Sequence, residues 1–388
     1  MSIFSGDAIG VDLGSANTTI YLDGEGLALR EATQVLSLRS DSQKVLAVGD
    51  KARALLGRTA EEVMLFSPVM DGAVTDTDVA ALLVLALTEK ATGRRKPMEK
   101  VRLFLSMSQG VTRVERLALE QTARLAGARR AYLVKTPLAA ALGAGLDTEQ
   151  MRGTMVAVLG GGTCEIAILS MNAIVAARSM RNGSFSMDEA IVRYVRRKKM
   201  LAIGARTAED IKCDIGSAEL PDYDAEDYDE DYTDEYDDPD KSPDPAGGGL
   251  TVAGAGEENG QDEPRPMEGE RVLLKGRDAR TGKPATITVT TRDIALALRE
   301  PVRILVDALR DALSRTPPEL AADILESGIH LSGGGALLPG LGEVLSTHTG
   351  VPVTISEHPQ DDVALGLGRL MDDERLLRAC IEAGSVEE

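Results

Sequence analysis

The sequence has few aromatic residues, few cysteines and no long apolar run, and each shortage excludes a class of protein. Aromatic residues make up 3% of the 388 residues and tryptophan is absent, which argues against a nucleic-acid-binding protein that stacks bases on aromatic rings. The cysteines Cys164, Cys213 and Cys380 lie far apart, without CxxC spacing or companion histidines. They therefore fit neither a disulfide framework nor a zinc site, and they favour a reducing cytosol.

We expect neither a signal peptide nor a membrane-spanning helix. The N-terminal residues MSIFSGDAIG contain no basic segment followed by an apolar run. The longest apolar stretches, such as residues 79–87, fall far short of the ~20 residues that cross a bilayer. The sequence therefore predicts a cytoplasmic protein rather than a secreted or membrane-spanning one.

The negative charge is concentrated in one segment. The formal net charge is −19, yet residues 219–240 alone hold 13 acidic and no basic residues, and residues 241–270 hold seven acidic and two basic ones. The rest of the chain is therefore close to neutral. Segment 219–270 is acidic, with tyrosines, glycines and prolines, and cannot bury enough apolar surface to offset chain entropy, so we predict that it is disordered. Either it is a solvated loop without specific function, or it is an electrostatic brake or a docking strip for a basic partner.

Hydrophobic periodicity predicts helices and strands that alternate, as in an α/β protein. Expected strands lie at residues 8–13, 18–22, 101–107, 154–159, 165–170, 174–178, 272–275, 285–290, 329–332 and 352–355. Expected helices lie at 79–91, 112–125, 138–142, 187–197, 207–216 and 291–314. Pro137 would open the third helix at its first position, where a missing N–H costs nothing. The strand–turn–strand pattern of residues 8–22 recurs at 154–170, which suggests a duplicated α/β body with a cleft between its halves.

Three glycine-rich turns are candidates for holding a nucleotide. Residues 12–18 (DLGSANT) and 160–163 (GGGT) each join two strands, and such turns expose backbone N–H groups in a concave nest that suits phosphate oxygens. Neither is a dinucleotide-binding turn, because that turn must open a helix. Residues 332–336 (SGGGA) precede a helix and would let a planar ring approach the backbone. One glycine-rich turn is a weak signal, but three in this order and spacing form a specific set.

With these turns, the sequence resembles the actin, sugar-kinase and heat-shock-chaperone ATPase superfamily and, within it, the MreB family of bacterial actin homologues. The resemblance covers nearly the whole chain outside the acidic segment and rests on residues 9–18, 56–59, 139–146, 188–191, 208–217, 317–320 and 331–338. It implies a duplicated actin-like ATPase fold of the α/β class, with two domains around a nucleotide cleft. The first domain would be residues 1–147, with a small subdomain at about 30–75. The second would be residues 148–371, interrupted by the insert at about 219–270. Residues 372–388 would form a C-terminal tail.

The resemblance also implies ATP and Mg²⁺ as ligands and assigns residues to them. Asp12 would face Mg²⁺ through its waters. The phosphates would be held by two turns: Gly14, Ser15, Ala16 and Asn17, then Gly160, Gly161, Gly162 and Thr163. Ribose and purine would be gripped by Glu209 and Lys212, one helical turn apart, with Gly333, Gly334 and Gly335 beneath the adenosine. Outside the family context, Glu209 and Lys212 would be taken for an exposed helix ion pair.

The sequence departs from the family where acidic residues are expected. Thr136, preceded by Lys135, occupies the position of the Glu that orients the attacking water, and threonine cannot act as a base near neutral pH. Val158 stands in place of an Asp of the Mg²⁺ shell, and residues 182–185 (NGSF) replace two glycines and an Asp. Removing one preorganised catalytic group commonly costs on the order of 10²–10³ in rate. The sequence therefore predicts nucleotide binding with weak or absent ATPase activity.

The leading prediction is an MreB-type filament protein that organises cell shape and cell-wall synthesis. One alternative is an active ATPase filament in which Thr136 supports slow turnover through a bound water. Another is a non-polymerising actin-fold adaptor of a membrane assembly. A sugar kinase would need a carboxylate base that we do not find, and a chaperone would need a substrate-binding domain after Met371.

Several partners are expected. The first is self-association into filaments, or copolymerisation with an intact paralogue. Cell-wall synthesis proteins are also expected, and nucleic acid is not. The basic loop at residues 93–98 (GRRKPM) would permit peripheral contact with an anionic membrane, although a merely solvated loop explains it equally well.

Overall fold

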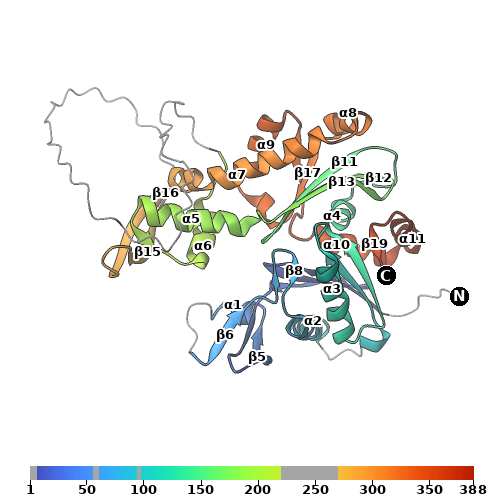
Figure 1. Ribbon diagram of the computed structural model, residues 1–388, viewed down its shortest axis with the longest axis horizontal. Coiled ribbons are helices and arrows are strands. Elements are labelled where there is room, and N and C mark those ends of the chain that lie inside the picture. The colour runs from blue at the N-terminus through green and yellow to red at the C-terminus, as the bar shows by residue number, and fades with distance from the viewer. Residues whose placement is uncertain (1–6, 56–60, 94–97, 220–269) are drawn as a thin grey trace.

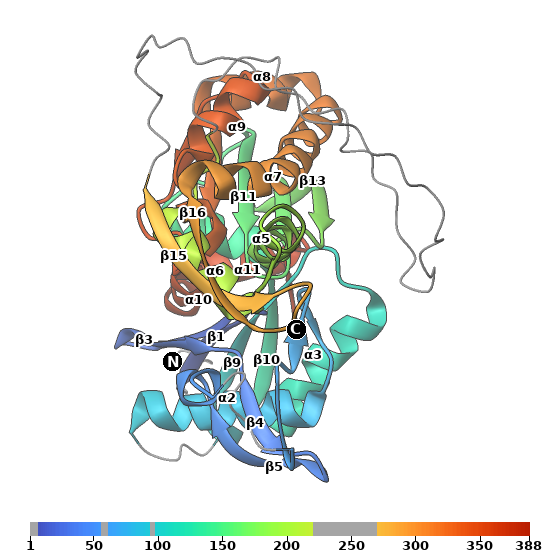
Figure 2. The same ribbon diagram turned by 90° about the vertical axis from the view of Figure 1, so that its left-hand side faces the viewer.

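The computed structural model describes residues 7–55, 61–93, 98–219 and 270–388. Three predicted features lie outside these residues: the body of the acidic insert, the family motif at 56–59 and most of the basic loop at 93–98. Within the described ranges, no helix combines the length and the apolar character that crossing a membrane requires. Figure 2 shows two halves, one above the other, each built on its own sheet.

The first half is built on a mixed sheet with the strand order β19-β10-β9-β1-β2-β3. Strand β1 pairs antiparallel with β2 and parallel with β9, which in turn pairs parallel with β10. The strands are β1 (Ala8–Leu13), β2 (Asn17–Leu22), β3 (Gly26–Ala32), β9 (Arg102–Met107), β10 (Arg130–Lys135) and β19 (Val386–Glu387).

Alternation along the strands of this sheet divides its side chains between two cores. Ile9, Val11 and Leu103 pack on one face against helices α2 (Thr77–Thr92) and α3 (Arg113–Leu125). Ala8 and Phe104, one residue out of phase with them, pack on the opposite face against α4 (Thr136–Gly143), α10 (Asp362–Asp372) and α11 (Glu374–Glu382). Period-2 alternation with both faces apolar is what a sheet covered by helices on both sides requires.

The second half repeats this arrangement. Its sheet has the order β13-β12-β11-β17-β18, in which β11 pairs antiparallel with β12 and parallel with β17. The strands are β11 (Thr154–Leu159), β12 (Cys164–Ser170), β13 (Ala173–Met180), β17 (Ile329–Ser332) and β18 (Val353–Ile355). The duplicated α/β fold predicted from the two strand–turn–strand units is therefore confirmed.

Helices from the second half of the chain cover the outer face of this sheet. Met155, Ala157 and Leu159 of β11 belong to a core that also contains apolar side chains of these helices. The helices are α5 (Ser184–Lys198), α6 (Ala205–Ile215), α7 (Thr291–Ser314), α8 (Pro318–Ser327) and α9 (Leu341–Thr349). Val156 and Val158, out of phase with the first set, face the opposite way and pack with α4.

The pair of helices α4 and α10 forms a layer shared by both sheets (Figure 1). Their contact is so close that it leaves no room for a side chain. A Cβ atom added to Gly143 of α4 would lie 1.7 Å from the backbone oxygen of Asp362, and one added to Gly366 of α10 would lie 1.8 Å from that of Ala139. The short distance between α4 and α10 therefore requires glycine at positions 143 and 366.

Two smaller sheets extend the halves. In the first half, β4 (Val35–Leu38) lies between β5 (Asp41–Val48) and β6 (Val63–Phe66), followed by the β7 (Val69–Met70) and β8 (Ala73–Val74) hairpin. Short helices there are α1 (Asp50–Arg53) and the 3₁₀ turn η1 (Met98–Lys100). In the second half, β14 (Leu201–Ala202), β15 (Arg271–Asp278) and β16 (Pro284–Thr290) form an antiparallel sheet beside α6.

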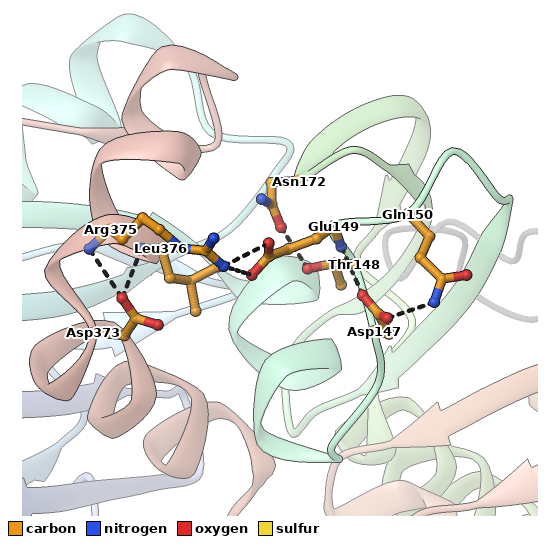
Figure 3. A network of polar contacts seen from close by, with 8 residues as sticks. All are labelled: Asp147, Thr148, Glu149, Gln150, Asn172, Asp373, Arg375 and Leu376. Carbon is orange, nitrogen blue, oxygen red and sulfur yellow. Dashed lines mark hydrogen bonds and ion pairs between the residues drawn. The ribbon is translucent and has the colours of Figure 1, made fainter.

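The segment between α4 and β11 connects the halves and is held by polar contacts (Figure 3). Thr148 donates its hydroxyl to the Asn172 side chain at 2.6 Å, and the Arg375 guanidinium of α11 lies 3.0 Å from the Glu149 carboxylate. Asp147 accepts hydrogen bonds from the Glu149 backbone and from Gln150. The predicted domain boundary at residue 147 falls within this connection.

Two predictions about local structure need correction. Helix α4 begins at Thr136, so Pro137 occupies its second position rather than its first. The difference matters because it places Thr136 inside the first turn of the helix. The predicted tail, residues 372–388, instead contains α11 and β19, and β19 pairs with β10 at the edge of the first sheet. Partly exposed ion pairs also connect Arg116 to Glu387 and Arg130 to Glu388 at this end of the chain.

The close contact of α4 and α10 gives a direct test of the fold. Gly366→Ala should destabilise the protein by about 3 kcal/mol or more, because the added methyl overlaps backbone atoms that cannot rotate away. Urea unfolding measures the loss. Gly342→Ala in α9 is the matched control: its Cβ would lie 3.6 Å from the nearest atom, of Ile355, so we expect no loss and a gain of up to ~1 kcal/mol. Equal effects of the two substitutions would contradict the proposed crowding.

Candidate functional site

The two glycine turns predicted to hold phosphate face each other across the halves. In each turn the first glycine donates its N–H to the carbonyl three residues on, Gly14 to Asn17 at 3.1 Å and Gly160 to Thr163 at 2.9 Å. A Cβ atom added to Gly161 would lie only 2.7 Å from the Ala16 side chain. Glycine is therefore required at 161 because the two turns approach closely.

A cavity of about 450 Å³ lies around these turns. Its lining includes every residue that the sequence predicted for the nucleotide site: Asp12, Gly14, Ser15, Ala16, Asn17, Gly160, Gly161, Gly162, Thr163, Glu209, Lys212, Gly333, Gly334 and Gly335. Thr136 and Val158, the positions where the family carries acids, also line it. The structure thus brings together residues from both halves that are more than 300 positions apart in the chain.

Backbone N–H groups of both turns are available to a ligand. In the described part of the chain, the amides of Ser15, Ala16, Gly161 and Gly162 donate no hydrogen bond to protein. The Ser15 hydroxyl instead accepts the N–H of Gly72 at 3.1 Å, which ties the first turn to the β7–β8 hairpin. Unpaired N–H groups that converge from two turns form a nest for anionic oxygens.

Asp12 supplies a carboxylate at the end of β1, beside the first turn. It accepts the Ser106 hydroxyl at 2.7 Å. Desolvation raises its pKa to about 6, against the lowering effect of that hydrogen bond. A cation bound beside Asp12 would compensate for this desolvation, because an opposite charge favours the ionised form.

Glu165 is a site residue that sequence reasoning missed. It lies on β12, is 3% exposed and lines the cavity. Its carboxylate accepts the backbone N–H of Gln109 from the first half at 2.7 Å, and Thr163 lies 3.5 Å away. Burial is the main cause that raises its pKa to about 7, and the charge of Asp12 adds to it. The available signal was an acidic residue inside an otherwise apolar strand, since a buried charge requires a specific partner.

Glu209 and Lys212 line the cavity from α6, but they do not pair with each other. The Glu209 carboxylate lies 2.5 Å from the Arg53 guanidinium on α1 of the first half. Arg206 also donates to the backbone oxygen of Arg53 at 3.4 Å. These contacts join the halves beside the cavity, which an exposed ion pair within one helix would not do.

Lys212 is held on the second half. Its ammonium lies 2.8 Å from the Asp188 carboxylate and donates to the Ser184 carbonyl at 3.1 Å. Desolvation raises the pKa of Asp188 to about 6, although the Lys212 charge opposes the shift. A nucleotide that engages Glu209 and Lys212 would therefore share them with Arg53 and Asp188.

The positions expected to hold catalytic acids present no carboxylate. Thr136 opens α4 after Lys135, and Val158 is 5% exposed on β11. Phe185, near Gly161, also lines the cavity. Among the described residues that line it, the carboxylates are those of Asp12, Glu165 and Glu209. No acid therefore lies at the start of α4.

Comparison with known proteins places the whole chain in one group. The family model described as MreB/Mbl protein matches residues 6–228 and 260–379. The chain is 35% identical to the cell shape-determining protein Mbl of Bacillus subtilis over 365 residues, 94% of this chain and 96% of that protein. It is 36% identical to the cell shape-determining protein MreB of Escherichia coli over 374 residues, 95% of this chain and 94% of that protein.

A solved structure supports the same grouping. The crystal structure of MreB5 of Spiroplasma citri bound to ADP matches with a TM-score of 0.79 and 26% identity, covering 97% of this chain and 99% of that one. The double helical filament of MamK matches with a TM-score of 0.69 at 18% identity, which supports the fold alone. The actin-like fold that the family resemblance implies is confirmed.

Buried Glu165 gives the site a measurable pH dependence. The raised pKa means that the folded chain binds a proton that the unfolded chain releases at lower pH. This contribution to stability is complete below the pKa of the unfolded state and is lost as the pH rises through about 7. Between pH ~4.5 and ~7.5, the free energy of unfolding of the wild type should thus fall by on the order of 2–3 kcal/mol relative to that of Glu165→Gln.

Urea unfolding of nucleotide-free protein at several pH values measures this difference. Gln keeps an oxygen that can accept the Gln109 N–H, so the substitution removes the charge and leaves that hydrogen bond. The exposed Glu343→Gln substitution controls for the loss of one carboxylate. Parallel stability curves for wild type and Glu165→Gln would show that Glu165 ionises normally.

Proposed function

The chain belongs to the MreB/Mbl protein family, and on that premise we propose that it is an ATP-binding, actin-like filament protein with weakened or lost ATP hydrolysis. Its cellular role would be to organise cell shape and cell-wall synthesis from the cytoplasm. The observation that carries the proposal is a cavity whose phosphate-binding backbone is complete while the start of α4 carries Thr136 in place of an acid.

The cavity suits a nucleotide with Mg²⁺. The unpaired amides of Ser15, Ala16, Gly161 and Gly162 converge where phosphate oxygens would lie. Asp12 has a carboxylate whose ionised form a nearby cation would favour. The related MreB5 of Spiroplasma citri has been solved bound to ADP and bound to AMPPNP. A bound Mg²⁺ would neutralise phosphate charge, while the residues of this chain orient the phosphates through backbone N–H groups.

The proposal of weak hydrolysis follows from proton chemistry. A water attacks phosphate faster when a positioned side chain orients it and accepts its proton. Thr136 orients a water by hydrogen bonding but accepts no proton near neutral pH. Losing such a group lowers the rate by on the order of 10²–10³, so binding would persist with ATP as a largely structural ligand.

Two alternatives remain, and one has an observation in its favour. Glu165, with a pKa near 7, is an acid in the cavity that would favour an active ATPase filament. A non-polymerising adaptor is the other alternative. Self-association into filaments is proposed on the ground of membership in the MreB/Mbl family, and an intact paralogue would be a copolymerisation partner. Cell-wall synthesis proteins and an anionic membrane surface complete the proposed partners.

A pelleting assay with Mg-ATP, followed by identification of the nucleotide in the pellet, separates these functions. We expect pelleted protein that retains intact ATP. ADP in the pellet would favour the active ATPase filament. Absence of a pellet, with nucleotide binding retained in solution, would favour the adaptor or a copolymer that needs its paralogue.

Restoring the missing acid is a second test. Thr136→Glu should raise the rate of phosphate release by on the order of 10²-fold, because it places a carboxylate in the first turn of α4, where the helix dipole also favours negative charge. Thr136→Glu with Val158→Asp should raise it further. Thr136→Gln, which matches the glutamate in size without its charge, should leave the rate unchanged. An unchanged rate in the Glu variants would contradict the role assigned to position 136.

A further inference from the structure

The sheet of β14, β15 and β16 presents an unpartnered face away from the core. Leu274 and Val289 pack inward and are buried. The alternate residues of β15 point outward: Leu273 is 70% exposed, and Lys275 and Arg277 are exposed as well. Register pairs these three with Thr288, Thr286 and Pro284 of β16, which are also exposed. Figure 1 shows this hairpin projecting at one end of the molecule.

This outward face, which we call the basic face, carries an excess of positive charge. Lys275 and Arg277 lie on it, and Arg280 and Lys283 lie in the turn that connects β15 and β16. In the described part of the chain, none of these four side chains forms an ion pair. The nearby acid Asp278 accepts the backbone N–H groups of Arg280 and Thr281. Its charge also interacts with that of Arg280, so the positive charge of Arg280 is partly compensated.

The face is also hollowed on the side of β14. A shallow depression lies between β15 and the start of α6. It is lined by Ala202, Ile203, Gly204, Thr207, Lys275, Gly276, Arg277 and Pro284. A positively charged face with a depression and an exposed leucine offers both charge and apolar contact to an extended acidic segment.

The chain itself supplies such a segment. Residues 222–240 contain 12 acidic residues, no basic ones, and Tyr223, Tyr228, Tyr232 and Tyr236. The described chain stops at Glu219 and resumes at Glu270, directly before β15. The C-terminal end of the insert is thus attached directly to this sheet, whereas Glu219 at the other end lies against Gly340, just before α9. A segment tethered in this way has an effective local concentration on the order of millimolar.

We propose that the acidic segment 222–240 binds the basic face of its own chain. Carboxylates would pair with Lys275, Arg277, Arg280 and Lys283, and tyrosine rings would cover Leu273 and stack on the arginine side chains. In this proposal, the basic partner expected for the acidic insert is the sheet of β14, β15 and β16 in the same chain. The inference does not depend on nucleotide binding or on hydrolysis, since no residue of the basic face belongs to the nucleotide cavity.

The test uses a fluorescent peptide of residues 222–240, with fluorescence anisotropy as the readout. A full-length chain lacking residues 222–240 should bind the peptide, because its basic face is vacant. The intact chain should bind it at least about tenfold more weakly, because its own segment competes at high effective concentration. Binding should disappear near 1 M salt, where the Debye length falls to about 3 Å.

Charge reversal locates the binding surface. In the deletion chain, Lys275→Glu with Arg277→Glu should weaken peptide binding by on the order of tenfold, since two attractions become repulsions. Lys44→Glu with Lys100→Glu, two exposed residues of the first half, is the matched control and should leave binding unchanged. The milder Lys275→Gln with Arg277→Gln keeps the test valid if the reversed pair fails to fold.

Zero-length carbodiimide crosslinking of the intact chain checks the contact directly. We expect crosslinks from Lys275 or Lys283 to acidic residues of 222–240 within one chain, and none from Lys44. Equal peptide binding by the intact and deleted chains, no binding by either, or crosslinks only between different chains would each overturn the proposal.

Discussion

The backbone contact between α4 and α10 is the constraint on which the rest of the structure depends. Gly143 and Gly366 let the two helices meet with no side chain between them, so their separation is set by backbone atoms. Both sheets then pack on this layer, the first through residues such as Phe104 and the second through Val156. Because a close-packed interior tolerates little change in volume, the distance between the sheets is fixed, and with it the distance between the two glycine turns at their edges.

Polar contacts across the cavity also connect the two halves, in addition to the layer of α4 and α10. The Gln109 N–H of the first half donates to buried Glu165 of the second, and Arg53 pairs with Glu209 beside the cavity. The two contacts differ in their contribution to the free energy of folding. The Arg53–Glu209 pair is about one-third exposed at both ends, and such pairs contribute little net stability. Glu165 loses hydration without gaining a cation, as its raised pKa shows. A buried carboxylate kept at this cost is what a ligand site with its own chemistry requires.

Much of this arrangement could be predicted from the sequence because its signals are local. Glycine turns after apolar strands located Gly14 and Gly160, and helical periodicity gave the bounds of α7 (Thr291–Ser314). The contacts that were missed depend on distant parts of the chain. Nothing near Glu209 indicates that Arg53 will reach it, and a strand as short as β19 has no periodicity to detect. Glu165 does carry a local signal, an acid in an otherwise apolar strand, but its partner Gln109 comes from the other half of the chain, so the sequence alone does not show what the acid contacts.

At the candidate site, ligand binding depends on backbone groups that the fold positions, whereas hydrolysis would depend on individual side chains. The proposed phosphate nest consists of backbone N–H groups, and the contact with Ala16 requires glycine at 161. The nest therefore depends on the fold rather than on a reactive side chain. A catalytic acid is a side chain, and replacing it alters neither the helix layer nor the turns. Thr136 is consistent with this, since it opens α4 and brings no carboxylate to the position where the proposal expects one. An actin-like protein can therefore lose hydrolysis through a few substitutions and retain nucleotide binding and fold. For this reason family membership predicts the cavity more firmly than the reaction within it.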